Sequence, residues 1–482
     1  MAHRHADLHA IAWRAMLAYG LEPAFPPAAL AEVATMHAPA SDAVVADQRA
    51  LLWFSIDNDD SRDLDQLTVA ERLPSGAVRL QVAIADVDAL VAVGSAVDGH
   101  ARRNTTSVYT AAQIFPMLPE RLSTDLTSLS DGEDRLAVIT ELDVDDAGTV
   151  LRSTVLRGLV HNHAKLAYDS VAAWLDGTGT LPEAAARVTG IDAQLRLQDG
   201  VAQALRQVRH EHGALDLETI EPKVEMQDGK VVALRPVAKN RARMLIEDVM
   251  IAANSATAHF LAEKKFPSVR RVIRSPRRWD RLVALAATFG TELPAAPDAP
   301  ALESFLVARR LADPLRFPDL SLTVVKLLGA GEYVAEAPGA TSEGHFGLAV
   351  RDYVHSTAPN RRYPDLVTQR LLKAAITGTP SPYGLAELQD IATRCTVQEN
   401  AADKVERQVR KSAAALLLSS RIGAHFDAIV TGASAKGTWA RALHPPVEGR
   451  IVHGFEGLDV GDRVGVKLAS VDVDRGFIDF VR

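Results

Sequence analysis

Three aspartates, Asp57, Asp63 and Asp65, lie within nine residues of one another early in the chain. Carboxylates crowded this closely repel each other, so a fold that gathers them normally needs a cation to neutralise them. The segment 55–66 contains neither Cys nor His, and hard oxygen ligands favour Mg²⁺, or Mn²⁺ in its place, over zinc. The alternative is a solvated acidic loop that binds nothing.

Two apolar runs frame the acidic segment and favour the metal site. Residues 50–54 lead into it, and residues 80–87 follow after a Pro-Ser-Gly turn, so we expect both runs to form strands. Carboxylates at the edge of a buried hairpin cost free energy unless they bind a partner.

Further motifs follow in collinear order between residues 50 and 420. They lie at 82–87, 106–109, 115–123, 245–254, 345–348 and 353–365. Together with the aspartates, these motifs resemble the catalytic (RNB) domain of the ribonuclease II/R family, and the chain looks closer to the ribonuclease II type. The resemblance implies an α+β fold and hydrolysis of single-stranded RNA from its 3′ end.

The same resemblance implies roles for individual residues. Asp57, Asp63 and Asp65 match metal ligands, and Gln66 stands where the family usually has a fourth aspartate. Glutamine can offer a neutral oxygen to the metal but no negative charge, so weaker metal binding is expected, with lost activity as the alternative. Asp65 and Arg361 match catalytic positions, and the planar guanidinium of Arg361 can stabilise charge that grows on a phosphate.

Other matches concern the path of the RNA. Tyr109 resembles the aromatic residue that stacks on the 3′-terminal base, whereas the second stacking aromatic of the family cannot be placed near residues 273–279. His345, Arg362 and Glu406 fall on positions that line the RNA channel of the family. A structural ion pair is the alternative for the two adjacent arginines.

The spacing of apolar residues and the Pro and Gly breaks divide the chain into three parts. Residues 1–48 are expected to form a helical module, either a helix-turn-helix that binds nucleic acid or a module that packs against the body. The resemblance implies that residues 49–420 form the RNB catalytic domain. Residues 425–482 contain short strands and Gly turns that resemble an S1 RNA-binding domain, an OB-type barrel. Its Phe426 and Trp439 are candidates for base stacking, with core packing as the alternative.

Composition restricts the class of protein. The chain of 482 residues is 47% hydrophobic and 24% charged, has no apolar run of membrane-spanning length and opens with no signal peptide. A single cysteine excludes an intramolecular disulfide framework, so we expect a cytoplasmic protein. The net charge of −8 disfavours nucleic acid, but the basic run 264–281 predicts a local electropositive path for phosphates.

The leading hypothesis is a monomeric, Mg²⁺-dependent, processive 3′→5′ exoribonuclease that releases nucleoside 5′-monophosphates from single-stranded RNA. The alternative is an RNA-binding protein on an RNB scaffold that lost catalysis, with Gln66 as the sign of that loss. A metabolic hydrolase that uses the Asp cluster is disfavoured by the S1-like segment.

Overall fold

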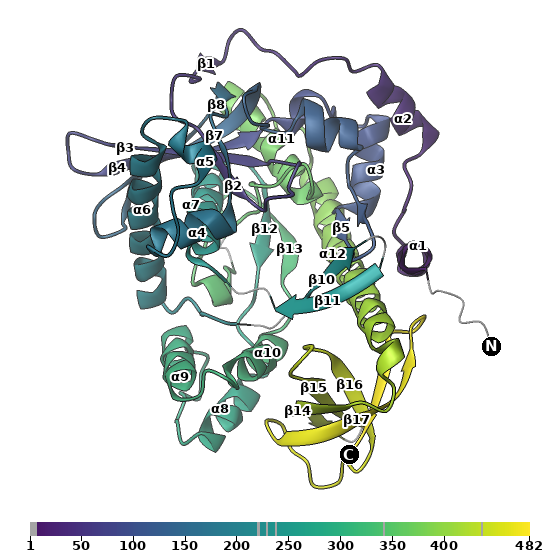
Figure 1. The fold of residues 1–482 in the computed structure, drawn as a ribbon. Coiled ribbons are helices and arrows are strands. Elements are labelled where there is room, and N and C mark those ends of the chain that lie inside the picture. Colours follow the sequence, from purple (N-terminus) through teal and green to yellow (C-terminus); the bar gives the residue numbers. More distant parts are fainter. Residues whose placement is uncertain (1–6, 219–221, 228–229, 237–238, 341–342, 435–436) are drawn as a thin grey trace.

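The structure, a computed structural model, describes residues 7–218, 222–227, 230–236, 239–340, 343–434 and 437–482. Its centre is a five-stranded sheet with the strand order β1-β8-β7-β4-β3 (Figure 1). The strands are β1 (Ala46–Asp47), β3 (Gln66–Arg72), β4 (Val78–Ala85), β7 (Asp134–Val144) and β8 (Val150–His161). All neighbours are antiparallel except β1, which lies parallel to β8.

Both faces of this sheet are buried. Successive side chains of a strand point to opposite faces, so Ala83 enters the core under α11 (Tyr363–Thr377), while Val82 and Ile84 enter the core under α6 (Ile191–Glu211) and α7 (Arg241–Glu263). A strand buried on both faces reads as a continuous apolar run. This explains why residues 80–87 show no polar alternation. The remaining helices of the body are α3 (Ala96–Asn104), α4 (Tyr168–Leu175) and α5 (Glu183–Ala186).

Four short two-stranded sheets, three antiparallel and one parallel, accompany the central sheet. They are β2 (Ser55–Asp57) with β9 (Lys165–Ala167), β5 (Val108–Tyr109) with β6 (Ile114–Phe115), β10 (Pro222–Gln227) with β11 (Lys230–Pro236), and β12 (Ser268–Val272) with β13 (Glu332–Glu336). The acidic segment therefore runs from β2 to the start of β3, and its two ends are fixed by two different sheets.

The long helix α12 (Leu385–Leu418) connects the parts of the molecule (Figure 1). Leu388 lies in the main core, Val405 packs against α1 (Leu8–Ala18), and Leu418 belongs to the core of the C-terminal barrel. The second N-terminal helix, α2 (Pro27–Ala34), packs on α3. Both N-terminal helices thus pack against the body, and the boundary at residue 48 stays a prediction.

The C-terminal strands form the predicted five-stranded barrel, in the order β14-β15-β16-β18-β17. These strands are β14 (His425–Ser434), β15 (Gly437–Ala442), β16 (Glu448–His453), β17 (Arg463–Asp472) and β18 (Phe477–Val481). A helical group, α8 (Trp279–Thr288), α9 (Ala299–Ala312) and α10 (Phe317–Leu328), lies beside the barrel (Figure 1). Arg441 of β15 and Asp319 of α10 form an ion pair of 2.6 Å between them.

The predicted α+β class is confirmed. Within the described ranges, no helix combines the length and the apolar character that crossing a bilayer requires.

Candidate active site

Asp65 lies at the centre of the candidate site. It immediately precedes β3 and is 2% exposed. Its carboxylate accepts hydrogen bonds from the backbone N–H of Asn360 at 3.1 Å and from Arg361 Nε at 3.3 Å. The segment 358–362 thus meets the acidic segment although almost 300 residues separate them.

Asp63 shares this environment. The hydroxyl of Tyr109 donates to Asp63 Oδ2 at 3.1 Å, and the backbone N–H of Tyr109 donates to Glu406 Oε1 at 2.8 Å. Tyr109 is 40% exposed, so part of its ring remains open to a ligand. The predicted residues Asp63, Tyr109 and Glu406 are therefore joined by hydrogen bonds.

The electrostatics of Asp65 fit a cation. The pKa of this carboxyl is raised to about 7, mainly by burial and also by the charge of Asp63, with Arg361 opposing both effects. Two carboxylates in a water-poor site need more positive charge than one arginine supplies. The donor set of Asp63 and Asp65 therefore fits a hard divalent ion.

Asp57 is turned to local partners. Its Oδ1 accepts from Ser61 Oγ at 2.7 Å and from the backbone N–H of Asn58 at 2.7 Å. Over the part of the chain that the structure describes, no three carboxylate, imidazole or thiol groups come close enough together to hold one ion. The expected grouping of three aspartates is therefore not seen, because the segment keeps Asp57 in its own turn. The roles of Asp57 and Gln66 as ligands stay predictions.

Gln66 is the first residue of β3 and is 8% exposed. Its Nε2 lies 3.5 Å from the backbone carbonyl of Ile56 in β2. An amide can donate to this carbonyl, whereas an ionised aspartate cannot. The glutamine thus fits the contact between β2 and β3.

The two neighbouring arginines have different surroundings. Arg361 is 44% exposed at its side chain and touches Asp65. Arg362 donates to Asp365 Oδ1 at 2.7 Å, and the Asp365 carboxylate is fully buried. Arg362 thus makes the structural ion pair given as the alternative, since its guanidinium neutralises a buried acid, and its contact with RNA stays a prediction.

His345 lies away from the carboxylates, in a group of aromatic rings that sequence reasoning missed. Its ring meets Tyr353 at 5.5 Å between centroids, and Tyr353 meets His355 at 5.7 Å. His355 Nδ1 pairs with the hydroxyl of Tyr333 at 2.8 Å. Burial lowers the pKa of His345 to about 4, so its ring is neutral. The spacing Tyr353-x-His355 was visible in the sequence, but Tyr333 carried no signal.

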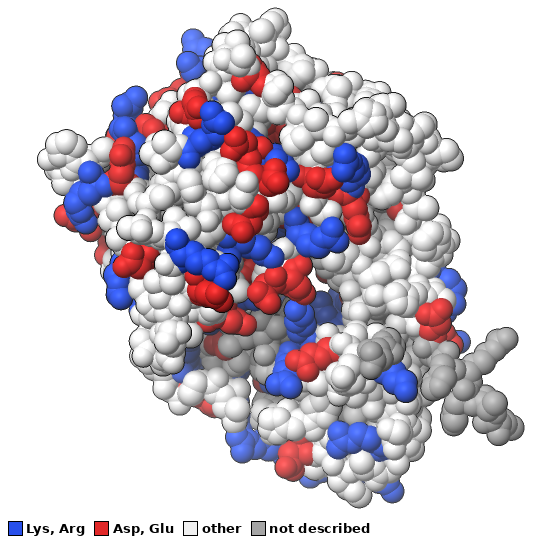
Figure 2. All heavy atoms as spheres, turned by 45° about the horizontal axis from the view of Figure 1, so that its top comes forward, with Lys and Arg blue, Asp and Glu red and all other residues white. Residues whose placement is uncertain are grey.

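A cavity of about 510 Å³ opens above the acidic segment. Asn58, Tyr109, Lys223, Arg243, Glu406 and Arg410 line it. Figure 2 shows basic and acidic side chains intermixed around the hollow centre of one face of the molecule. The local charge is thus set by individual residues and not by one basic surface.

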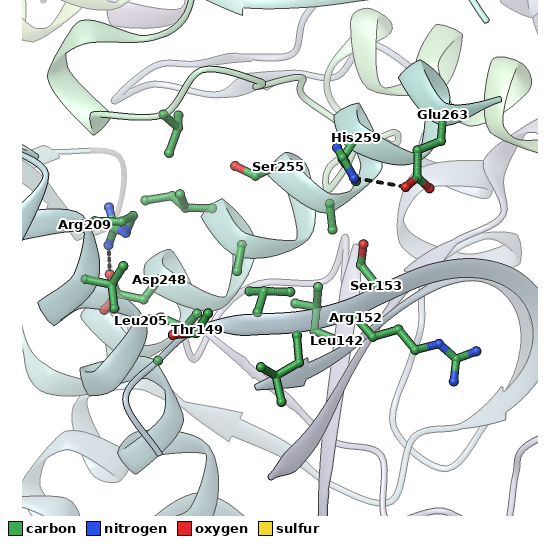
Figure 3. A pocket seen from close by; sticks show the side chains of 18 residues that line it. Leu142, Thr149, Arg152, Ser153, Leu205, Arg209, Asp248, Ser255, His259 and Glu263 are labelled. Atoms are coloured by element: carbon green, nitrogen blue, oxygen red, sulfur yellow. Dashed lines mark hydrogen bonds and ion pairs between the residues drawn. The ribbon is translucent and has the colours of Figure 1, made fainter. Parts of the chain in front are cut away.

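A second cavity, of about 590 Å³, lies between α6, α7 and the start of β8 (Figure 3). Two pairs of its charged groups face each other, Arg209 with Asp248 and His259 with Glu263, and much of the remaining lining is apolar. Such a lining does not suit a phosphodiester.

The predicted basic run 264–281 is neutralised in part. Arg270 pairs with Glu336 at 2.9 Å, Arg271 with Glu399 at 2.5 Å, and Arg274 with Glu332 at 2.5 Å. These ion pairs neutralise three of the eight basic residues of the run, so the electropositive path stays a prediction.

The two candidate stacking residues differ in their exposure within the barrel. Phe426 is 6% exposed and meets Phe480 at 6.1 Å in the barrel core, so its role as an RNA contact is corrected to core packing. Trp439 lies on β15 and is partly exposed. Only Trp439 of the pair keeps a surface that a base can reach.

Sequence comparison places this geometry in a family. The profile of the RNB domain matches residues 45–378, and that of the RNase II-type exonuclease C-terminal S1 domain matches residues 424–482. The chain belongs to the RNB-domain family.

Ribonuclease R of Vibrio parahaemolyticus is 28% identical over 470 residues, covering 90% of this chain and 55% of the relative. The chain thus spans about half the length of the curated relatives it matches. They carry the name Ribonuclease R, whereas the sequence alone favoured the ribonuclease II type.

Solved structures of RNB proteins have the same fold. The apo form of Mycoplasma genitalium RNase R superposes with a TM-score of 0.88 at 23% identity, covering 99% of this chain and 78% of that one. Its complex with ribose methylated single-stranded RNA gives the same TM-score and coverage at 22% identity. At this identity the likeness concerns the fold.

Proposed function

We propose that this protein is a processive 3′→5′ exoribonuclease that hydrolyses single-stranded RNA to nucleoside 5′-monophosphates. The contact between Asp65 and Arg361 is the observation that carries the proposal. It joins an acid fit to hold a metal with a guanidinium fit to hold a phosphate, and the two come from opposite ends of the RNB domain. The name of the related ribonucleases and the RNA bound in one of the similar structures support it.

The chemistry divides between the carboxylates and the arginine. Asp63 and Asp65 would hold Mg²⁺, or Mn²⁺ in its place, with Asp57 and Gln66 as further ligands that remain proposals. When bound, such an ion lowers the pKa of a water molecule and neutralises the 3′-oxygen that leaves. Arg361 binds the scissile phosphate through its planar fork and stabilises the charge that grows on it.

The exposed ring of Tyr109 orients the 3′-terminal nucleotide by stacking on its base. Its hydrogen bonds to Asp63 and Glu406 fix the ring relative to the carboxylates. A base held in this way places the last phosphodiester next to Asp65. One nucleotide is then the natural unit of hydrolysis.

We also propose that the protein acts in the cytoplasm and as a monomer. A single, buried cysteine supports a reducing compartment. An RNA strand that must thread to a buried site supports a molecule with an open face.

The alternative, an RNA-binding protein with a degenerate site, rests on Gln66. It predicts retained RNA affinity without turnover. The intact contact between Asp65 and Arg361 favours the enzyme.

The first experiment incubates the protein and its Asp65→Asn variant with a 5′-labelled poly(A) oligomer and Mg²⁺. Shortening from the 3′ end to a small 5′ core, absent in the variant, supports the exoribonuclease. Uncut but retarded RNA in both samples, with no rescue by Mn²⁺, would replace the proposal by the binding protein.

A further inference from the structure

Arg243 lies in the first turn of α7 and lines the cavity above the acidic segment. Its Nη2 donates to Asn58 Oδ1 at 2.8 Å, and its guanidinium carbon lies 4.5 Å from the centre of the Tyr168 ring. These two contacts fix the plane of the guanidinium at the cavity wall. Neither contact supplies a negative charge.

This arginine differs from its neighbours in its lack of a counter-ion. Arg241, one half-turn away, pairs with Asp199 at 2.6 Å, and Arg206 and Arg209 share Asp248. No carboxylate in the described ranges lies within ion-pair distance of Arg243, and its buried Nε has no acceptor there. A half-buried guanidinium whose Nε is buried without an acceptor is costly, so the position suits an anion that arrives from outside.

The contact with Asn58 ties the position of Arg243 to the acidic segment. The backbone N–H of Asn58 donates to Asp57 at 2.7 Å, so the residue that anchors Arg243 also shapes the segment that leads to Asp63 and Asp65. Lys223 adds a second, exposed cation to the cavity wall. An anion at Arg243 would therefore lie in the same cavity that Tyr109, the hydrogen-bond partner of Asp63, lines.

We infer that Arg243 forms a subsite that binds one backbone phosphate of the RNA near its 3′ end. A phosphate can accept two parallel hydrogen bonds from the edge of a guanidinium that faces it. The inference rests on the proposed function, since RNA must be the molecule that enters the cavity. It adds a phosphate contact that is separate from Arg361 and fixes the register of the strand.

The test is a thermodynamic cycle between one residue and one phosphate. Full-length protein in the Asp65→Asn background, which prevents hydrolysis, is titrated with RNA oligomers that carry a neutral methylphosphonate at one position near the 3′ end. With Arg243 present, one position should weaken binding about tenfold, the effect of a lost charge-assisted hydrogen bond. With Arg243→Gln, native RNA should bind about tenfold more weakly, and the same methylphosphonate should cause no further loss.

Two further readings sharpen the result. The slope of log affinity against log salt should fall by about one for Arg243→Gln, and Arg243→Lys should keep this slope while losing part of the affinity. Arg152→Gln serves as the matched control, because this exposed arginine points away from the second cavity in Figure 3 and should preserve the penalty at the sensitive phosphate.

The subsite would be overturned if a methylphosphonate weakened RNA binding equally at every position, both in the protein with Arg243 and in the Arg243→Gln variant. Arg243 would then be a structural support of Asn58. Circular dichroism and the Arg243→Lys variant separate this result from misfolding. Absence of RNA binding in all the proteins would instead overturn the proposed function, and the subsite with it.

Discussion

The hydroxyl of Tyr109 donates to Asp63 Oδ2 at 3.1 Å while the Tyr109 ring stays 40% exposed. One residue thus touches an acid of the proposed metal site and offers a face to a base. The two tasks belong to different atoms, so substitutions can separate them.

Tyr109→Phe keeps the ring and removes the hydroxyl. We expect RNA affinity to stay within about twofold, because stacking is retained, and turnover to fall several-fold, on the order of 1 kcal/mol for one hydrogen bond. Tyr109→Ala should weaken binding by about 1–3 kcal/mol and lengthen the final 5′ core. Gel analysis of limit products, with affinities measured in the Asp65→Asn background, checks both. Identical behaviour of the two variants would contradict the separation.

The ion pairs of Arg361 and Arg362 are expected to serve different purposes, turnover for Arg361 and stability for Arg362. Asp365→Ala leaves the guanidinium of Arg362 buried without its acid, and we expect it to lower the free energy of unfolding by about 3–5 kcal/mol. Arg361→Ala should lower turnover by at least about 100-fold and cost less stability than Asp365→Ala, because the Arg361 side chain is 44% exposed. Urea unfolding and initial rates give the two readouts. Equal destabilisation by both would show that Arg361 is structural.

Gln66→Asp tests the departure from the family pattern. A carboxylate at this buried position faces the Ile56 carbonyl and lies beside two other acids, so without metal we expect a loss of about 1–3 kcal/mol of stability. Added Mg²⁺ should restore part of it, since the ion would neutralise the new charge. Thermal unfolding with and without Mg²⁺ measures this linkage. A large rescue of turnover from zero would favour the binding-protein alternative for the natural chain.

His345 gives stability a pH dependence. Its pKa is about 4 in the folded protein because of burial, against an ordinary value near 6.5. Between these values the unfolded chain binds the proton and the folded one does not, so stability falls as pH drops from about 6.5 to about 4. Above this window the residue has no effect. His345→Asn should flatten that part of the curve in urea titrations across the range. An unchanged slope would mean that other groups cause it.

The barrel provides a matched pair of aromatic substitutions. Phe426→Ala opens a cavity in the barrel core and should cost about 3–5 kcal/mol of barrel stability. Trp439→Ala should leave unfolding nearly unchanged and reduce RNA affinity by about 1–3 kcal/mol if the ring stacks on a base. Fluorescence-monitored unfolding and RNA titration distinguish them. Loss of RNA affinity in a still folded Phe426→Ala barrel would contradict the core assignment.

The sequence by itself determined the family, the α+β class and the C-terminal barrel. Motifs in collinear order and short strands between Gly turns are local properties, readable along the chain. The same order of motifs also pointed to five residues that hydrogen bonds join in two groups, Asp63 with Tyr109 and Glu406, and Asp65 with Arg361.

Only the tertiary structure decided what each side chain faces. Arg361 and Arg362 are neighbours of identical type, yet the helix start that buries Asp365 takes up one and leaves the other at Asp65. The same holds for Phe426 and Trp439, which barrel closure sends to the core and to a partly exposed strand. Arg243 had no signal at all, because the absence of a counter-ion is a property of the packed structure. Charge pairing and burial depend on contacts between distant segments, and spacing along the chain does not encode them.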